Sequence, residues 1–231
     1  MEPISRIVPH FQESLDALKE RLLAMGGLVE AQVHTAVRAL VERDRSLIGR
    51  VTDGDAPVNR LHIDIDSRCF TLLALHQPMA TDLRTIVSAV KINTDLERVG
   101  DLAVNLVEAA ERYLKHAPVK PLVDIPRMAD LAQAMLRDAL DAFVRRDTVL
   151  AQHVLDTDDE VDGLKDQVFR ELLGSMAKDH GLIEPALDLI LASRHLERIA
   201  DHATNVAEDV IFIVSARDVR HHAWEGGPGS E

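Results

Sequence analysis

The chain has 231 residues, a formal net charge of -13 and a single cysteine, Cys69. The charge disfavours binding to the phosphate backbone of nucleic acids, and one cysteine excludes an intramolecular disulfide. Its residues are 46% hydrophobic but only 3% aromatic, which is typical of helical proteins and not of sheet proteins. No segment approaches the about 18 consecutive apolar residues of a membrane span, and the N-terminus lacks a leader pattern, so we expect a cytoplasmic protein without membrane insertion.

The first half of the chain predicts three helices. Apolar residues recur at helical spacing from Phe11 to Leu40, and Gly26-Gly27 within this run indicates a kink or a close helix contact. Prolines set the other boundaries, because proline lacks an amide hydrogen and is tolerated best in the first turn of a helix. We therefore predict a turn at 52–57, a second helix at 57–76 and a third helix at 80–115.

The second half is predicted to repeat this plan. Three prolines make 117–126 a linker between a first unit, residues 1–116, and a second unit, residues 127–217. The second unit is expected to form helices at 127–154, 158–180 and 184–217, and the segment 218–231 is expected to be disordered. The sequence thus predicts an all-α fold of two tandem three-helix bundles related by internal duplication.

An internal repeat supports the duplication. Residues 96–108 match residues 196–208 at seven of thirteen positions, and most of the matched residues are polar. Earlier segments match at a shift of 103, which places Arg43-Asp44 over Arg146-Asp147 and Val58 over Val161. Because a shared apolar stripe cannot explain matched polar residues, the repeat indicates that a polar site was duplicated.

The repeated segment places polar side chains on one helix face. In each copy a glutamate, an aspartate and an asparagine follow at four-residue spacing, with apolar residues on the opposite side. Like charges at this spacing destabilise a helix by roughly 0.2 to 0.5 kcal/mol. Two interpretations remain open: a solvated face screened by arginines, or a cation site whose oxygen ligands suit Mg²⁺, Mn²⁺ or oxidised iron. His195 and His202 flank the second Leu-Glu-Arg-x-x-Asp motif, at 196–201, and could add nitrogen ligands, which would favour iron or zinc there. The candidate metal ligands are Glu97, Asp101, Asn105, Glu197, Asp201 and Asn205.

Three motifs resemble the PhoU family of phosphate-signalling regulators: LHQPMATDLR at 75–84, DLERVGD at 95–101 and HLERIADHA at 195–203. The resemblance covers nearly the whole chain and implies two three-helix bundles. It also implies a negative regulator of the phosphate-starvation response that couples the ATPase subunit of a phosphate ABC transporter to a sensor histidine kinase. In this family multinuclear metal clusters are implied, with iron favoured and magnesium, manganese or zinc as alternatives. The implied ligands are Glu97, Asp101, Glu197 and Asp201.

The acidic faces, which carry Glu97 with Asp101 and Glu197 with Asp201, have other interpretations besides a metal site. Asn59 and Asp162 also resemble family positions, but we interpret them as helix caps, because each starts an expected second helix. No phosphate-binding loop, dinucleotide-binding turn or nucleophile motif is present, so the chain is not expected to be an enzyme. The alternatives are a metal-free helical adaptor and a metal-carboxylate enzyme. Acidic stripes that need neutralising favour association into a homo-oligomer, with a dimer expected.

Overall fold

The computed structural model describes residues 7–119 and 122–219. Over these residues the chain forms α-helices and two short 3-10 helices, at Arg45–Leu47 and His180–Leu182, and no strand. The predicted all-α fold is therefore confirmed. The α-helices are α1 (Ile7–Val41), α2 (Ile48–His76), α3 (Ala80–Tyr113), α4 (Asp124–Arg145), α5 (Thr148–Lys178) and α6 (Ile183–Ser215).

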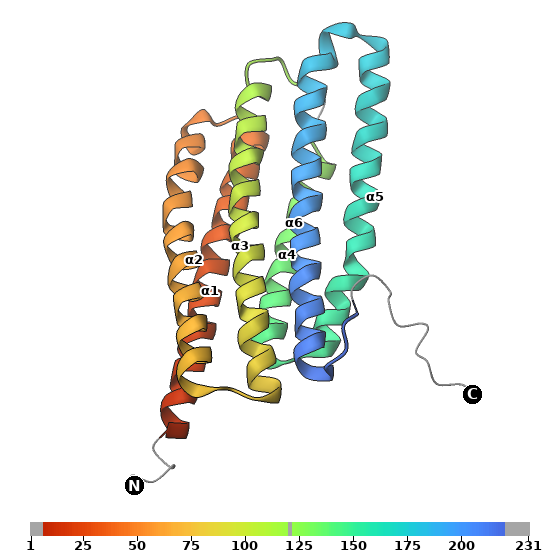
Figure 1. Cartoon of the computed structure of the whole chain (residues 1–231). Coiled ribbons are helices and arrows are strands. Elements are labelled where there is room, and N and C mark those ends of the chain that lie inside the picture. The colour runs from red at the N-terminus through yellow and green to blue at the C-terminus, as the bar shows by residue number, and fades with distance from the viewer. Residues whose placement is uncertain (1–6, 120–121, 220–231) are drawn as a thin grey trace, which may run out of the picture.

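The helices form two three-helix bundles that lie side by side. Helices α1, α2 and α3 pack against one another, and so do α4, α5 and α6. Contacts between α3 and α6 and between α1 and α4 join the two halves. Figure 1 shows α2, α3, α6 and α5 in one layer with α1 and α4 behind it. Of the helices described, none is both long and apolar enough to cross a membrane.

The first turn of the structure lies nearer the N-terminus than we predicted. Residues 52–57 are inside α2, and Pro57 is an interior residue of that helix. The chain instead turns at Arg43, which has a left-handed φ of 56°, and Asp44 accepts a hydrogen bond from the amide of Ser46. Proline in a helix interior costs about 3 kcal/mol. Val51 and Val58, two helical turns apart, are both fully buried, and burial of each contributes about 1.5 to 3 kcal/mol, which offsets that cost.

The second half contains the same error at equivalent positions. The predicted helices 127–154 and 158–180 are wrong at their junction, because α4 ends at Arg145 and α5 begins at Thr148. Arg146 has a left-handed φ of 55°, and Asp147 accepts hydrogen bonds from the amides of Val149 and Leu150. An aspartate that accepts from the first free amides of a helix is a strong N-cap. The matched Arg-Asp pairs thus mark the true helix starts in both halves.

The remaining boundaries differ by a few residues from those predicted. Helix α4 begins at Asp124, so the last part of the segment expected to be a linker is its first turn. Pro126 is accommodated there because the first turn of a helix has no amide partner to lose. Residues 216–219 are irregular after α6, and the rest of the segment expected to be disordered lies outside the described residues.

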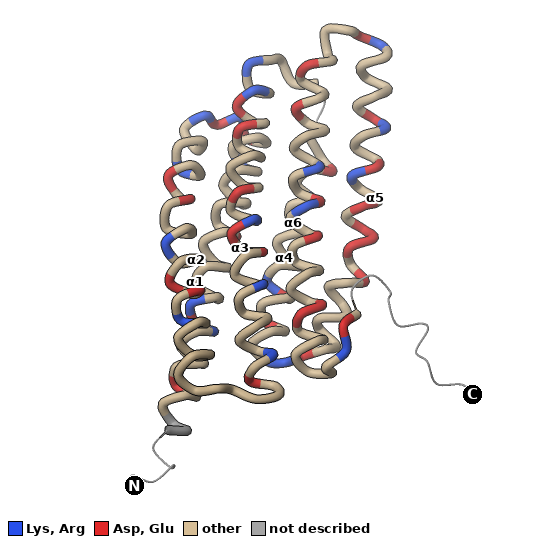
Figure 2. The backbone as a smooth tube through the Cα atoms, viewed as in Figure 1, with Lys and Arg blue, Asp and Glu red and all other residues tan. Residues whose placement is uncertain are grey.

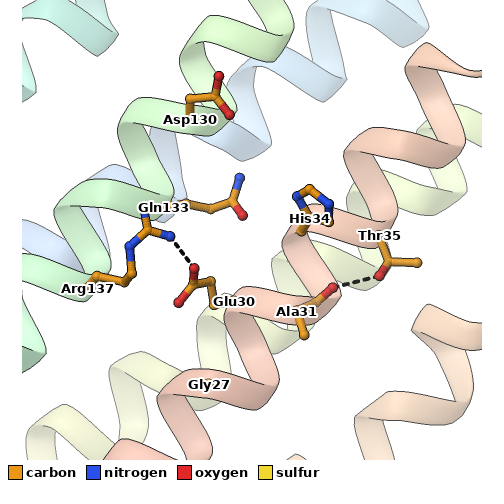
Figure 3. A pocket seen from close by; sticks show the side chains of 8 residues that line it. All are labelled: Gly27, Glu30, Ala31, His34, Thr35, Asp130, Gln133 and Arg137. Carbon is orange, nitrogen blue, oxygen red and sulfur yellow. Dashed lines mark hydrogen bonds and ion pairs between the residues drawn. The ribbon is translucent and has the colours of Figure 1, made fainter.

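The contact between α1 and α4 is close at one glycine. A Cβ atom added to Gly26 would lie 2.3 Å from Cδ1 of Leu140, whereas one added to Gly27 would meet nothing within 4 Å. The close helix contact predicted for this glycine pair is therefore present at Gly26. Beside it a groove of about 550 Å³ separates the helices, with Arg137 of α4 paired to Glu30 of α1 across it (Figure 3).

The contact between α3 and α6 is partly polar. Arg112 Nε lies 2.9 Å from Asp188 Oδ1, and Lys91 Nζ lies 3.2 Å from Asp209 Oδ1. The side chains of Asp188 and Asp209 are only 10% and 4% exposed. Buried carboxylates of this kind are costly unless they are paired, so these two ion pairs favour the observed arrangement of the halves.

Candidate functional site

In the second half, carboxylates from two helices gather on one face. Asp158 and Asp162 lie one helical turn apart on α5, and Glu197 and Asp201 have the same spacing on α6, which packs against α5. Figure 2 shows the acidic stretch in the middle of α5 beside α6. Lys165 Nζ lies 2.8 Å from Asp162 Oδ1 and 3.0 Å from Glu197 Oε1, so its ammonium bridges the two helices.

Crowding of these carboxylates changes their proton affinity. Burial raises the pKa of Asp158 to about 6, and the negative charges of Asp201 and Asp162 add to the rise. Burial and the charge of Glu197 raise the pKa of Asp201 as well. The hydrogen bond to Asp162 raises the pKa of Lys165. The cluster therefore has excess negative charge that one ammonium does not fully neutralise.

We expect Asp158→Asn to raise the free energy of unfolding at pH 8 by about 1 kcal/mol and to change nothing at pH 3. Below the ordinary pKa of 3.8 the folded and unfolded states both hold the proton, so the side chain makes no difference. As the pH rises towards 6 the unfolded state ionises more readily, and the folded state loses stability. The full shift corresponds to about 3 kcal/mol, which partial exposure screens to about 1 kcal/mol.

Urea unfolding of protein treated with chelator, followed by circular dichroism at both pH values, measures this effect. Asp166→Asn is the control, because Asp166 is an exposed aspartate on the same helix. Equal stabilisation by Asp158→Asn at pH 3 and pH 8 would show that the change in stability does not come from crowding of negative charges.

The first half has the same layout with different side chains. Glu97 and Asp101 are half-buried on α3, and Arg98 lies 3.6 Å from Glu97 Oε2 and 3.2 Å from Asp101 Oδ2. At the shift of 103, Asp55 and Asn59 of α2 correspond to Asp158 and Asp162. Asn59 Nδ2 donates to Asp55 Oδ2 at 2.7 Å. This half therefore has fewer carboxylates than the second.

Asn59 and Asp162 are not helix caps. Both lie in helix interiors, because α2 and α5 begin about three turns earlier than predicted. Their side chains interact with Asp55 and with Lys165 on their own helices. The interpretation as caps is wrong, and its cause is the misplaced turn described above.

The asparagines of the repeat are not placed alike. Asn205 Nδ2 donates to Asp95 Oδ1 of α3 at 3.2 Å, and His202 Nδ1 lies 2.8 Å from the same oxygen. Asn205 and His202 therefore contact the other half of the molecule through Asp95. Asn105 is half-buried on α3. His195 is also half-buried, and burial lowers its pKa, with Arg198 and Arg112 adding to the effect.

The donor set suits a hard cation, since carboxylate oxygens are the ligands that Mg²⁺, Mn²⁺ and oxidised iron prefer. As the side chains stand, no three His, Cys, Asp or Glu residues in the described part of the chain converge in a metal-binding arrangement. A metal ion would therefore need the carboxylates to turn towards one another. The raised pKa values of Asp158 and Asp201 indicate that added positive charge would be favourable in the second cluster.

Comparison with protein families gives two matches to the PhoU domain, at residues 22–110 and 125–210. The chain belongs to the PhoU family. Each matched PhoU domain contains one copy of the repeated Glu-Asp pair, Glu97 with Asp101 in the first and Glu197 with Asp201 in the second. The matches therefore coincide with the internal repeat.

Proteins named PhoU match this chain over nearly their whole length. The chain is 41% identical over 216 residues to the phosphate-specific transport system accessory protein PhoU homolog of Pseudomonas aeruginosa, covering 93% of this chain and 89% of the relative. The homolog from Aquifex aeolicus is 39% identical, with 93% and 98% covered. The crystal structure of PhoU from Pseudomonas aeruginosa superposes with a TM-score of 0.86 at 40% identity, covering 90% of this chain and all of that one. The phosphate transport system regulatory protein PhoU from Streptococcus pneumoniae gives 0.83 at 27% identity, with 90% and 99% covered.

Proposed function

We propose that this protein is a negative regulator of the phosphate-starvation response. It would act in the cytoplasm by binding its partners directly. It would couple the ATPase subunit of a phosphate ABC transporter to a sensor histidine kinase and modulate phosphate uptake. The observation that carries the proposal is full-length similarity to proteins named as accessory to phosphate-specific transport.

A deletion strain tests the regulatory function. Without this protein, alkaline phosphatase activity should be high in medium with abundant phosphate, because the kinase is no longer held inactive. Reintroduction of the intact gene should restore repression. Unchanged repression in the deletion strain would exclude the proposed role.

We further propose that the acidic faces bind metal ions, with iron favoured and magnesium, manganese or zinc as alternatives. Glu97, Asp101, Glu197 and Asp201 would provide the ligands, and a bound ion would supply the positive charge that these faces lack. Asn105 and Asn205 are weaker candidates, because Asn205 contacts Asp95. Association into a dimer through such ions belongs to the same proposal. Metal analysis of protein purified without chelator or metal-affinity resin distinguishes this function from a metal-free adaptor.

A metal-carboxylate enzyme remains the second alternative. Such an enzyme would hold its ligands inside a bundle. Here the four carboxylates lie half-buried or exposed on a face of the bundle. A regulator accords with this placement better than an enzyme does.

A further inference from the structure

The groove between α1 and α4 lies where the two halves of the chain meet. Its volume of about 550 Å³ is within the range of small-molecule sites, about 300 to 1,000 Å³. The shift of 103 makes six of its eight lining residues equivalent in pairs: Gly27 with Asp130, Glu30 with Gln133, and His34 with Arg137. The two walls are therefore equivalent in position but carry different side chains.

One end of the groove is linked across, and the other end is not. Arg137 of α4 is ion-paired with Glu30 of α1. At the equivalent positions His34 replaces the arginine and Gln133 replaces the glutamate, and no hydrogen bond or ion pair joins these two within the described chain. Figure 3 shows their side chains pointing towards one another across the groove. A polar group placed between them would be a second link between the halves.

Gln133 is a buried acceptor at this second end. The residue is only 6% exposed, and its Nε2 donates to the carbonyl of Ala129, one turn earlier on α4. Its Oε1 accepts no hydrogen bond from the part of the chain that the structure describes. An unpaired acceptor in a buried residue is unfavourable, so a ligand that donates a hydrogen bond to it gains affinity.

The groove also has an excess of negative charge. Asp130 lies one turn before Gln133 on α4, is exposed, and has no ion-pair partner among the described residues. Glu30 and Arg137 neutralise one another, so the Asp130 carboxylate is the uncompensated charge. This charge repels an anion and attracts a cation. A guanidinium group presents N–H donors in a planar fork, which suits a carboxylate with a second acceptor beside it.

We propose that the groove between α1 and α4 binds a small organic cation of the guanidinium class. Asp130 provides the counter-charge, Gln133 Oε1 accepts a hydrogen bond, and His34 contacts the ligand from the opposite wall. A ligand held by both walls joins the two halves at the end that the Glu30–Arg137 pair leaves open. This site is on different helices from the acidic faces and does not depend on the proposed regulatory function.

Isothermal titration calorimetry of the full-length protein with butylguanidinium tests the inference, at low ionic strength so that charges are not screened. Butylurea is the matched probe, because it has nearly the same shape and similar N–H donors but no charge. Butylguanidinium should bind at least about tenfold more tightly than butylurea. Asp130→Asn should weaken butylguanidinium binding by about tenfold, and Gln133→Met, which removes the acceptor and keeps a similar volume, by about fivefold.

Asp141→Asn is the control for Asp130→Asn. Asp141 is an exposed aspartate on the same helix that does not line the groove, and its replacement changes the net charge equally. It should leave binding unchanged. Arg137→Met frees the Glu30 carboxylate and should tighten butylguanidinium binding by about threefold or more, whereas it would weaken the binding of an anion. Circular dichroism checks that each variant is folded.

Several results would overturn the inference. No binding of butylguanidinium stronger than about 1 mM would exclude the site. Equal weakening by Asp130→Asn and Asp141→Asn would show that the cation responds to the net charge of -13 and not to the groove. Equal affinity for butylurea would show that the groove does not recognise charge. Inorganic phosphate that binds more tightly than butylguanidinium, and whose binding is lost in Arg137→Met, would make the groove an anion site. The regulatory role is tested separately by the deletion strain.

Discussion

Replacement of Arg112 by methionine should lower the free energy of unfolding by about 3 kcal/mol. Arg112 of α3 is the partner of Asp188 of α6, and the Asp188 side chain is only 10% exposed. Methionine retains the apolar part of the side chain but leaves a buried carboxylate without a counter-charge, which is the costly outcome. Urea unfolding at pH 7, followed by circular dichroism, measures the loss.

Two further variants show whether the unpaired charge is the cause. Arg112→Met combined with Asp188→Asn should recover most of the stability, because no buried charge remains. Arg145→Met removes an ion pair with Asp141 whose side chains are 67% and 52% exposed, and it should change stability by no more than about 0.5 kcal/mol. Equal losses from Arg112→Met and Arg145→Met would contradict the assignment of the effect to burial.

Substitution of neighbouring glycines in α1 should have opposite effects. Gly26→Ala should destabilise the protein by about 1 to 3 kcal/mol, because the new methyl group meets Leu140 Cδ1 of α4 and the buried Leu140 must move. Gly27→Ala should stabilise it by about 0.5 to 1 kcal/mol, because the space around Gly27 is open and alanine favours the helix. Thermal unfolding of the two variants measures the difference.

The second variant is the control for the first, since both change glycine to alanine in one helix. Stabilisation by Gly26→Ala as well would show that α4 moves away without cost, and that the contact between α1 and α4 does not restrain the halves.

Most of the helical architecture could be predicted from the sequence. The boundaries of α3 and α6 follow from Pro78, from Gly181 and from long apolar periodicity, and these agree within about two residues. The starts of α2 and α5 could not be predicted from local propensity. Pro57 favours a turn locally, but burial of Val51 and Val58 decides the matter, and burial depends on helices distant in sequence.

The acidic faces were predictable only in part. Four-residue spacing within the repeat placed the glutamate and aspartate of each half on one helix. The partners across the helix interface, such as Lys165, depend on how far α5 is shifted along α6, which no local pattern contains. The aligned Arg-Asp pairs at a shift of 103 would have supplied the starts of α2 and α5, but not the position of α5 along α6. The contact of Asn205 with Asp95 depends in turn on how the two halves are joined.

The two ion pairs between α3 and α6, Arg112 with Asp188 and Lys91 with Asp209, join halves that are not equivalent. At the shift of 100, the counterpart of Asp188 is Ser88, and the counterpart of Lys91 is Leu191. Two copies of the first half would place Arg112 opposite a serine, and two copies of the second would leave Asp188 without its arginine. Each half therefore supplies the charged partner that the other half needs. An arrangement of two identical halves would lack both ion pairs, so the polar contact between α3 and α6 requires the two halves to differ.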